Sequence, residues 1–335
     1  MATIQSIVDR IQSGHAKRIL VLTGAGISTT AGIPDFRTPQ TGLYDRLAPL
    51  RLPYPEAIFH ISYFQHTPEP FYAIARARHP RNLIPTVSHA FLALLARKNL
   101  LHFVVTQNID GLEADAGVPV ERVLAAHGSW RTQRCWRCKM SYPDADMMRA
   151  IETGEVPYCR EEGCGGAVKP DVVFFGEALP PAFHHVVEQE KVPEADLMII
   201  MGSSLKVAPC SRLPQLVGED VPRVLINLER AGDVGSRAVD VCLLGSCDEG
   251  VRRLGDEMGW REELEKVWGD AVARKKELDL DMDINWRDDN GPDLDEAIQK
   301  LAEKMKGSTT SEGHKRMLEQ HLEAKFAHLL PKHRG

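Results

Sequence analysis

The sequence predicts an α/β protein with a doubly wound parallel (Rossmann-like) sheet, a smaller lobe and a helical C-terminal extension. The first observation is a series of short apolar runs that are mostly continuous rather than alternating, which is typical of strands buried on both faces of a parallel sheet. The second is that helical patterns separate several of these runs, as in βαβ crossovers. The third is a group of four cysteines in a segment that interrupts the alternation. A second module is therefore expected beside the sheet.

The expected strands follow one another at intervals that leave room for helices. In chain order they are residues 18–23, 101–108, 122–128, 171–176, 196–204, 223–229 and 240–246. Residues 88–98 (SHAFLALLARK) have the apolar spacing of a connecting helix. We assign residues 1–37, 82–130 and 169–260 to a large domain that contains the sheet. Residues 38–81, rich in proline and aromatic side chains, and residues 131–168, which hold the four cysteines, would form a small lobe across a cleft.

After Trp260 the sequence becomes charged and helix-forming, and residues 261–335 are expected to form a helical extension. A linker, 281–292, precedes a helix that Asp293 would cap, with Glu296 at the spacing of a capping box. That helix and a second one, after the linker 306–313, each have an apolar face, formed by Leu294, Ile298, Leu301 and Met305 and by Leu318, Leu322, Phe326 and Leu329. Docking on the core, a lid over the cleft and pairing between protomers in a homo-oligomer stay open, as does a nuclear-export signal on the second face.

Composition and charge argue against several classes of protein. Of the 335 residues, 43% are hydrophobic and 26% are charged, as in soluble globular proteins. No apolar run approaches the roughly 18 residues of a membrane-spanning helix, and the N-terminus lacks the apolar stretch of a signal peptide, so we expect an intracellular protein. A net charge of −6 argues against direct binding of nucleic acid, which needs a basic surface.

Four cysteines form two pairs, with CxxC spacing at Cys135 and Cys138 and CxxxxC spacing at Cys159 and Cys164. Two short knuckles that each deliver two thiolates supply the tetrahedral ligand set of a Zn²⁺ ion. Because all four ligands would come from the protein, no position is left for water or substrate, and the ion would be structural. A chance cluster or a disulfide pair is the alternative. The remaining cysteines, typical of a reducing compartment, are Cys210, Cys242 and Cys247.

Polar and glycine-rich segments follow several of the expected strands. Residues 24–28 (GAGIS) come directly after the first strand and are expected to open a helix, where glycines would let the phosphates of a dinucleotide approach the backbone. Gly32 does not complete a GxGxxG pattern, so an ordinary strand-to-helix turn is the alternative. Gln107, Asn108 and Asp110 follow a strand at the edge where ligands bind in such folds, although the same residue types also stabilise turns.

Several segments together resemble the sirtuins, the silent-information-regulator family of NAD-dependent protein lysine deacylases. They are residues 24–44 (GAGISTTAGIPDFRTPQTGLY), 106–117 (TQNIDGLEADAG), His127-Gly128, the four cysteines, 169–177 (KPDVVFFGE) and 202–209 (GSSLKVAP). The resemblance covers about residues 15–260, and these motifs are collectively specific to one family. Residues 52–64 (LPYPEAIFHISYF) and the length of the tail are most similar to the cytosolic branch, including its fungal members.

The resemblance implies an NAD-dependent protein lysine deacetylase. In this family the acetyl oxygen of a bound acetyl-lysine attacks the anomeric carbon of the nicotinamide ribose, expels nicotinamide and leaves an alkylimidate. A base must then deprotonate a ribose hydroxyl, and by the match this base is His127, whose imidazole suits proton transfer at neutral pH. Asn108 would be the second catalytic residue, because it would position a ribose hydroxyl and a water molecule.

The resemblance also assigns residues to an NAD site. Gln107 would contact the same ribose, Ile109 and Asp110 would receive the nicotinamide carboxamide, and Phe36 would shield the reactive sugar from water. The residues implied around the phosphates and riboses are Gly24, Ala25, Gly26, Ser28, Asp35, Arg37, Gly202, Ser203 and Ser204, and those around the adenosine are Asn227, Glu229 and Cys247. Some of these also have purely structural readings, such as a core phenylalanine, a surface arginine or a small buried thiol.

On the substrate side, residues 173–177 and 204–207 resemble the two extended edges between which the family places a peptide as an added strand. The implied contacts are Val173, Phe174, Phe175, Gly176, Glu177, Leu205 and Val207, with Val173 and Phe174 gripping the lysine stem. The partners would be acetylated proteins, either histone tails or cytosolic proteins, in the cytoplasm with shuttling to the nucleus. Arg78 could bind an acidic acyl group, but Ala75 stands where succinyl-removing sirtuins have tyrosine, so we expect neutral acyl groups.

Three other functions would use the same residues. A mono-ADP-ribosyltransferase would cleave NAD in the same way and transfer ADP-ribose to a protein nucleophile. An inactive module would bind NAD or acetyl-lysine without turnover, and a Rossmann dehydrogenase would retain the nicotinamide. The presence of Gln107, Asn108, Asp110 and His127 together argues against the inactive module. Measuring free nicotinamide with and without an acetylated peptide separates these alternatives.

Overall fold

A parallel sheet of six strands forms the centre of the larger part of the molecule. The computed structural model describes residues 2–33, 43–78, 83–281 and 294–305. The strand order is β3-β2-β1-β6-β7-β8, so the direction of winding reverses between β1 and β6. The bounds are β1 Ile19–Thr23, β2 Leu101–Thr106, β3 Val123–Ala125, β6 Leu197–Met201, β7 Arg223–Asn227 and β8 Val241–Leu244. All pairings in this sheet are parallel, which confirms the doubly wound fold.

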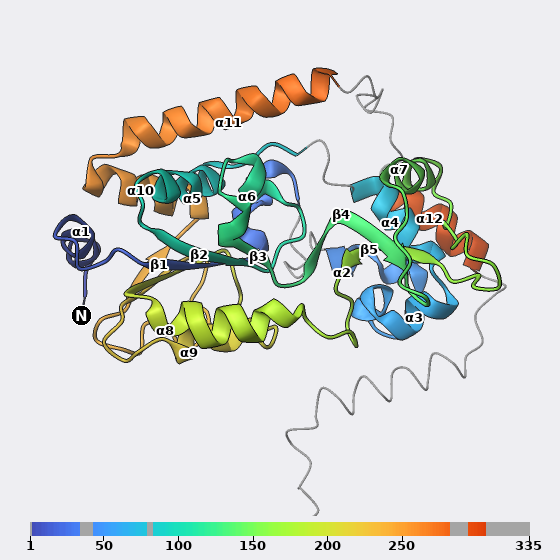
Figure 1. Ribbon diagram of the computed structural model, residues 1–335, viewed down its shortest axis with the longest axis horizontal. Helices are drawn as coiled ribbons and strands as arrows, with labels where there is room; N and C mark the ends of the chain where they lie inside the picture. Colours follow the sequence, from blue (N-terminus) through green and yellow to red (C-terminus); the bar gives the residue numbers. More distant parts are fainter. Residues whose placement is uncertain (1, 34–42, 79–82, 282–293, 306–335) are drawn as a thin grey trace, which may run out of the picture.

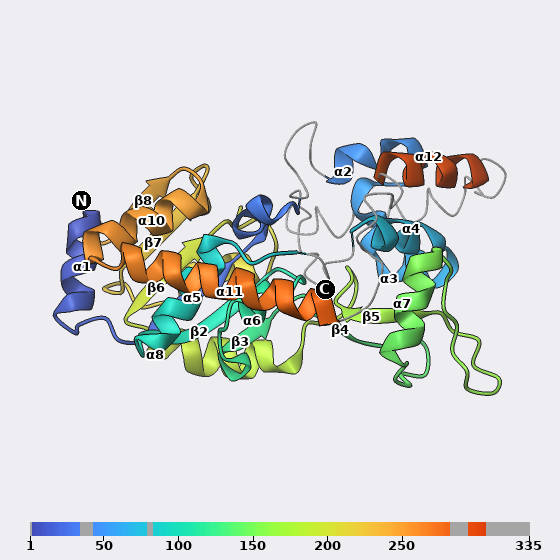
Figure 2. The ribbon, with the colours of Figure 1, turned by 90° about the horizontal axis from the view of Figure 1, so that it is seen from above.

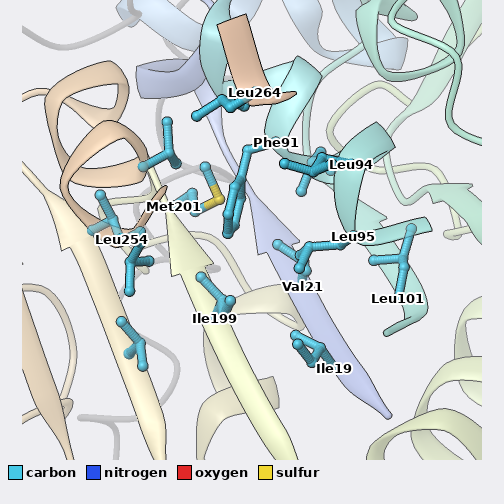
Figure 3. Packing of buried hydrophobic residues seen from close by; sticks show 14 of the residues in the cluster. Ile19, Val21, Phe91, Leu94, Leu95, Leu101, Ile199, Met201, Leu254 and Leu264 are labelled. Carbon is cyan, nitrogen blue, oxygen red and sulfur yellow. The ribbon is translucent and has the colours of Figure 1, made fainter. Parts of the chain in front are cut away.

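Helices cover both faces of this sheet (Figure 1). One face carries α1 Ile4–Gln12, α5 Val87–Arg97, α10 Cys247–Met258 and α11 Arg261–Asp281, and the other carries the π-helix η7 Phe183–Lys191, α8 Val192–Glu194 and α9 Leu213–Leu216. Alternate side chains of β1 enter two separate cores. Ile19 and Val21 pack in the cluster that contains Phe91 (Figure 3), whereas Leu20 and Leu22 pack in the cluster on the opposite face. Because both faces are buried, the strands are continuously apolar.

Short elements connect these layers. They are the helix α6 Leu112–Asp115, which lies beside α5, and the 3-10 helices η1 Ala25–Ile27, η2 Thr29–Ala31, η6 Val120–Arg122 and η8 Cys210–Arg212. Among the described helices, none combines the length and the apolar character that crossing a membrane requires. Short polar loops follow the carboxyl ends of the parallel strands, and the candidate site lies among these loops.

A smaller lobe lies beyond one end of the sheet domain (Figure 1). Its elements are α2 Leu43–Arg46, η3 Ala48–Leu50, η4 Pro55–Phe59, α3 Ile61–His66, α4 Glu69–Arg78 and α7 Asp144–Thr153, with an antiparallel pair of strands, β4 Gly128–Cys135 and β5 Val168–Val172. The core of this lobe is aromatic, because the ring centres of Phe64 and Phe71 lie 5.4 and 5.1 Å from that of Phe174. Two segments far apart in the sequence therefore share one core.

One strand prediction is wrong. The sequence predicts a parallel strand at residues 171–176, but β5 spans Val168–Val172 and pairs antiparallel with β4. The apolar side chains of Val172 and Phe174 are buried by the helices of the small lobe instead of the large sheet. A continuous apolar run indicates that a segment is buried but not which element covers it. The assignment of residue ranges to domains stays a prediction.

The C-terminal extension contacts both parts of the molecule (Figures 1 and 2). α11 runs along α5, and α12 Leu294–Met305 packs on α4 and η3 of the small lobe. Ile298 and Leu301 are 1% and 8% exposed, and Arg46 forms an ion pair with Asp295 at 2.9 Å. The predicted helix is thus confirmed, and it docks on the core. Asp293 and the second predicted helix, with Leu318, Leu322, Phe326 and Leu329, lie outside the described residues.

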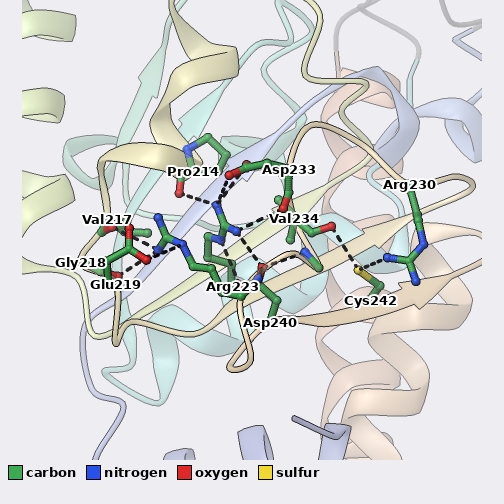
Figure 4. A network of polar contacts seen from close by, with 12 residues as sticks. Pro214, Val217, Gly218, Glu219, Arg223, Arg230, Asp233, Val234, Asp240 and Cys242 are labelled. Atoms are coloured by element: carbon green, nitrogen blue, oxygen red, sulfur yellow. Dashed lines mark hydrogen bonds and ion pairs between the residues drawn. The ribbon is translucent and has the colours of Figure 1, made fainter. Parts of the chain in front are cut away.

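A buried network of ion pairs fixes the amino end of β7 (Figure 4). The side chain of Arg223 is 0% exposed and pairs with Asp240 at 2.7 Å and with Asp233 at 3.1 Å. It also donates to the Pro214 carbonyl at 3.0 Å. Because a buried guanidinium must be paired and hydrogen-bonded, these contacts join β7 to the loops around it. The network lies at the opposite end of the strands from the loops described next, so its role is structural.

Candidate active site

The polar segments predicted from the sequence meet at the carboxyl edge of the large sheet. The Gly24 N–H donates to the Met201 carbonyl at 3.0 Å, and the Gln107 N–H donates to the Thr23 carbonyl at 2.9 Å. The loops that follow β1, β2 and β6 are therefore joined side by side, and His127 follows β3 at the same edge. The winding reverses between β1 and β6, which is where ligands bind in doubly wound sheets.

Contact between two loops requires the glycines after β1. A Cβ added to Gly24 would lie 2.6 Å from the carbonyl oxygen of Gly202, and one added to Gly26 would lie 2.6 Å from the Gly202 Cα. Gly202 itself has a φ of 63°, in the left-handed region that favours glycine. The segment forms the 3-10 helices η1 and η2, which end at Gly32 with a φ of 91°. The helix that residues 24–28 were expected to open is replaced by these two short 3-10 helices, because the chain turns to pack its backbone against the loop after β6.

A hydrogen-bonded network connects this loop with the residues after β2. Asn108 is 9% exposed, and its Nδ2 donates to the Gly24 carbonyl and to Ser28 Oγ, each at 3.1 Å. Ser28 Oγ donates to Asp110 Oδ2 at 2.8 Å, and Asp110 Oδ1 accepts from the Leu112 N–H at 3.0 Å. Within the described part of the chain, no hydrogen bond engages Asn108 Oδ1. This acceptor can therefore serve a ligand. Ile109 is partly buried between these residues.

His127 has the protonation state that a general base requires. Its Nδ1 lies 2.8 Å from the carbonyl oxygen of Gln107, which can only accept, so Nδ1 carries the proton and Nε2 has the free lone pair. Burial lowers the pKa of His127, although the bond to the Gln107 carbonyl opposes this shift, so the imidazole is neutral at pH 7. The His127 carbonyl accepts from the Val173 N–H at 2.7 Å. The main chain of His127 is therefore hydrogen-bonded directly to the expected substrate segment, residues 173–177.

Two serines continue the site along β6. Ser203 Oγ donates to Gln107 Oε1 at 2.6 Å and accepts from the Leu205 N–H at 3.2 Å. Ser204 is exposed next to it. Both hydroxyl groups lie at the reversal of the sheet, and their role toward phosphates stays a prediction.

Asn227 and Cys247 lie farther along the same edge. Asn227 Nδ2 donates to the Glu229 carbonyl at 2.8 Å, and Glu229 is exposed. Cys247 is the first residue of α10, and its thiol donates to the Ile226 carbonyl at 3.4 Å. Burial raises the pKa of Cys247 to about 12, so the thiol is neutral and unreactive. Three other predicted residues, Asp35, Phe36 and Arg37, lie outside the described residues.

The segment 173–177 is held from the small lobe. The Phe175 N–H donates to the Phe59 carbonyl at 2.8 Å, and the Phe175 side chain is 41% exposed. Phe174 is only 1% exposed, and Lys169 Nζ lies 4.6 Å from its ring centre. Glu177 pairs with Lys169 at 3.0 Å and accepts from the Phe174 N–H at 2.9 Å. Phe174 and Glu177 thus hold the backbone of this segment in place through contacts within the protein, Phe174 by packing and Glu177 by hydrogen bonding. Four other residues were predicted to contact the substrate: Val173 and Val207 are partly buried, Leu205 is buried and Gly176 is exposed. Of the two residues considered for acyl choice, Ala75 is buried, and the side chain of Arg78 lies outside the described residues.

The four cysteines converge as the sequence predicts. Their Sγ atoms lie within 4.8 Å of one another, with 3.5 Å between Cys135 and Cys164 and between Cys138 and Cys159. These distances are too long for a disulfide bond of about 2.05 Å and close to the separation of about 3.8 Å that four sulfurs have around a tetrahedral zinc ion. A Cβ on Gly166 would lie 2.8 Å from Cys135 Sγ, so glycine makes room for the cluster. The ligand set fits one structural zinc ion and excludes the disulfide alternative.

Comparison with known proteins agrees with this arrangement. Residues 24–209 match the model of the Sir2 family. The chain belongs to the Sir2 family. It is 54% identical to the NAD-dependent protein deacetylase hst2-2 of Emericella nidulans, over 98% of this chain and 93% of that protein. It is 41% identical to the NAD-dependent protein deacetylase hst2 of Schizosaccharomyces pombe, over 92% and 94% of the two chains, and 43% identical to the NAD-dependent protein deacetylase sirtuin-2 of Danio rerio, over 79% and 74%.

Three buried residues next to the candidate site, Thr23, Thr106 and Glu113, were not predicted from the sequence. Glu113, within the TQNIDGLEADAG motif, is 1% exposed and bonds the hydroxyl of Thr23. Thr23 and Thr106 end β1 and β2 and are partners in the strand register. A threonine at the end of each of two buried strands was the available signal, because a buried hydroxyl needs a partner. The glutamate gave none, since this residue type is usually exposed on a short helix.

Proposed function

We propose that this member of the Sir2 family is an NAD-dependent protein lysine deacetylase. It transfers the acetyl group of acetyl-lysine to ADP-ribose and yields deacetylated lysine, nicotinamide and O-acetyl-ADP-ribose. Its relatives of similar length are NAD-dependent protein deacetylases by name, which supports this activity. The observation that carries the proposal is the neutral imidazole of His127, which is bonded to Gln107 at the ligand-binding edge and adjoins Val173.

The contacts of each site residue support a separate role. His127 accepts a proton at Nε2, while the Gln107 carbonyl holds the Nδ1 proton and so fixes the tautomer. Asn108 offers Oδ1 to a ribose hydroxyl or a water molecule, because its Nδ2 is bonded within the protein. Asp110, held by Ser28, orients the carboxamide of nicotinamide. NAD, when bound, supplies the electrophilic ribose carbon and the nicotinamide leaving group.

The residues at the end of β7 favour NAD over NADP. Glu229 is exposed there and can accept hydrogen bonds from ribose hydroxyls, whereas it would repel a 2′-phosphate. The guanidinium of the neighbouring Arg230 contacts Cys242, with Nη1 3.8 Å from Sγ. We expect kcat/KM with NADP to be at least about tenfold lower than with NAD, since one like-charge contact of about 1.4 kcal/mol has that effect. Equal use of both dinucleotides in steady-state assays would contradict this assignment.

We infer that acetylated protein segments bind in an extended form beside residues 173–177 and 204–207. Pairing through the main chain is weakly selective for sequence, so both histone tails and cytosolic proteins qualify as substrates. We expect the protein to remove neutral acyl groups from lysine. The resemblance of residues 52–64 to the cytosolic branch of the family supports a cytoplasmic location. Shuttling to the nucleus would require the leucine-rich face at residues 318–329 to act as an export signal.

The proposal is tested with the zinc-loaded full chain, NAD and a peptide that contains one acetyl-lysine. We expect nicotinamide and deacetylated peptide to form in a one-to-one ratio, with O-acetyl-ADP-ribose in the product mass spectrum. Nicotinamide release with ADP-ribose attached to protein would indicate a transferase instead. No release would indicate an inactive binding module, and formation of NADH would indicate a dehydrogenase.

A further inference from the structure

We propose that Glu113 is a positioning residue for the reaction, which sets Asn108 and Gln107 against the ribose through the hydroxyl groups of two threonines. The inference rests on the proposed deacetylase function. Glu113 does not reach the surface of the site, since it is 1% exposed. It lies on α6, immediately behind the loop that carries Gln107, Asn108 and Asp110.

Two threonines hold the carboxyl group. Thr23 and Thr106 end adjacent parallel strands and are partners in their register. Thr23 Oγ1 donates to Glu113 Oε1 at 3.2 Å, and the hydroxyl group of Thr106 interacts with the same carboxyl group, lowering its pKa. Thr23 and Thr106 are 0% and 2% exposed, so water cannot replace Glu113 as their partner. The carboxyl group therefore joins the ends of β1 and β2 from below the site.

Both threonines bear directly on residues of the proposed reaction. Thr106 Oγ1 accepts the N–H of Asn108 at 3.1 Å, and the Thr23 carbonyl accepts the N–H of Gln107 at 2.9 Å. The Gln107 carbonyl in turn lies 2.8 Å from Nδ1 of His127. Displacement of Thr106 would therefore move Asn108. Displacement of Thr23 would move Gln107, whose carbonyl holds the imidazole of His127. A misplacement of about 1 Å at reacting groups can reduce a rate by about a hundredfold.

Burial and the charge of Asp110 disfavour the charged form of Glu113, whereas the interactions with Thr106 and Thr23 favour it. Burial raises the pKa of Glu113 to about 7, and the charge of Asp110 adds to this rise. Titratable or charged groups on the neighbouring elements include His89 on α5, Asp115 on α6 and Asp248 on α10. On α11, Lys275 pairs with Asp115 at 3.1 Å, and Arg274 donates to the Ala116 carbonyl at 3.4 Å. A neutral carboxylic acid accepts from Thr23 and donates from its own hydroxyl, whereas a carboxylate can only accept and repels Asp110. Glutamine reproduces the neutral acid in shape and in its mixed bonding.

The test compares Glu113→Gln with Glu113→Leu in the zinc-loaded full chain. We expect Glu113→Gln to keep kcat within about threefold of the wild type, because its carbonyl accepts from Thr23 and its N–H donates to Thr106. Glu113→Leu has a similar volume but bonds neither threonine, so kcat should fall by about 10- to 100-fold while KM for the peptide stays unchanged. Asp115→Asn is the matched control, because it removes a carboxylate from the same helix without touching the threonines, and it should retain wild-type kcat.

A second variant tests the same link with a smaller change. Thr106→Val removes the hydroxyl that accepts the Asn108 N–H and should lower kcat and weaken NAD binding in calorimetry, whereas Thr106→Ser should restore both. Wild-type kcat and NAD affinity in both Glu113→Leu and Thr106→Val would overturn the inference. So would a loss that disappears after correction for the fraction of folded protein. A wild-type chain without deacetylase activity would refute the proposed function instead, and NAD affinity would then decide the positioning role.

Discussion

The ionisation of Glu113 should make the stability of this protein fall as the pH rises. Its pKa is raised from 4.5 to about 7, first because burial penalises the charged form and second because of the charge of Asp110. Between these two pH values the folded protein keeps a proton that the unfolded chain releases, so the free energy of unfolding decreases with pH. The difference, 7 − 4.5 = 2.5 units, corresponds at about 1.4 kcal/mol per unit to about 3 kcal/mol over the whole window.

Glu113→Gln isolates this contribution, because glutamine does not titrate. We expect urea unfolding at pH 5 and at pH 8, with zinc present, to show the variant gaining about 2 to 3 kcal/mol relative to the wild type as the pH rises. Titrating groups that do not interact with Glu113 are common to both proteins and cancel in the comparison, whereas the interaction with Asp110 is part of the measured difference. If the relative stability of the two proteins changes by less than about 1 kcal/mol, Glu113 has an ordinary pKa and the reasoning fails.

Three further predictions concern the base, the metal and the tail. His127→Ala should reduce deacetylation by roughly 10²- to 10⁴-fold with an unchanged circular dichroism spectrum, because it removes only the positioned base; equal rates would eliminate that role. Cys135→Ala should forfeit much of the roughly 10 to 16 kcal/mol that structural zinc supplies, with loss of zinc in elemental analysis and unfolding of the small lobe. A fully active variant without zinc would contradict it. Ile298→Ala should weaken docking of α12 by about 2 to 4 kcal/mol and increase hydrogen exchange in α4, whereas unchanged exchange would mean that the contact contributes little.

Local patterns in the sequence were enough for much of the fold. The strands β1, β2, β6 and β7 were predicted from continuous apolar runs, because each is buried on both faces and needs no partner to be recognised. The zinc site was predicted from spacing alone, since CxxC and CxxxxC turns already bring their sulfurs together in pairs. The place of residues 107–110 at the carboxyl edge also followed, because parallel strands end on the same side, whereas His127 was identified by the resemblance to the sirtuins.

What the tertiary structure decided depends on contacts between distant segments. The run at 171–176 is buried by the small lobe, and no local feature distinguishes that lobe from a second face of the sheet. Glycine is needed at positions 24 and 202 because two backbones meet there. The two positions are 178 residues apart in the sequence (202 − 24), so no local pattern indicates their contact. The environment of Glu113 arises in the same way. By itself the sequence determined which segments are buried and which side chains follow strands; only packing placed a carboxyl group beneath two threonines, because burial and hydrogen bonding between remote residues are properties of the folded chain.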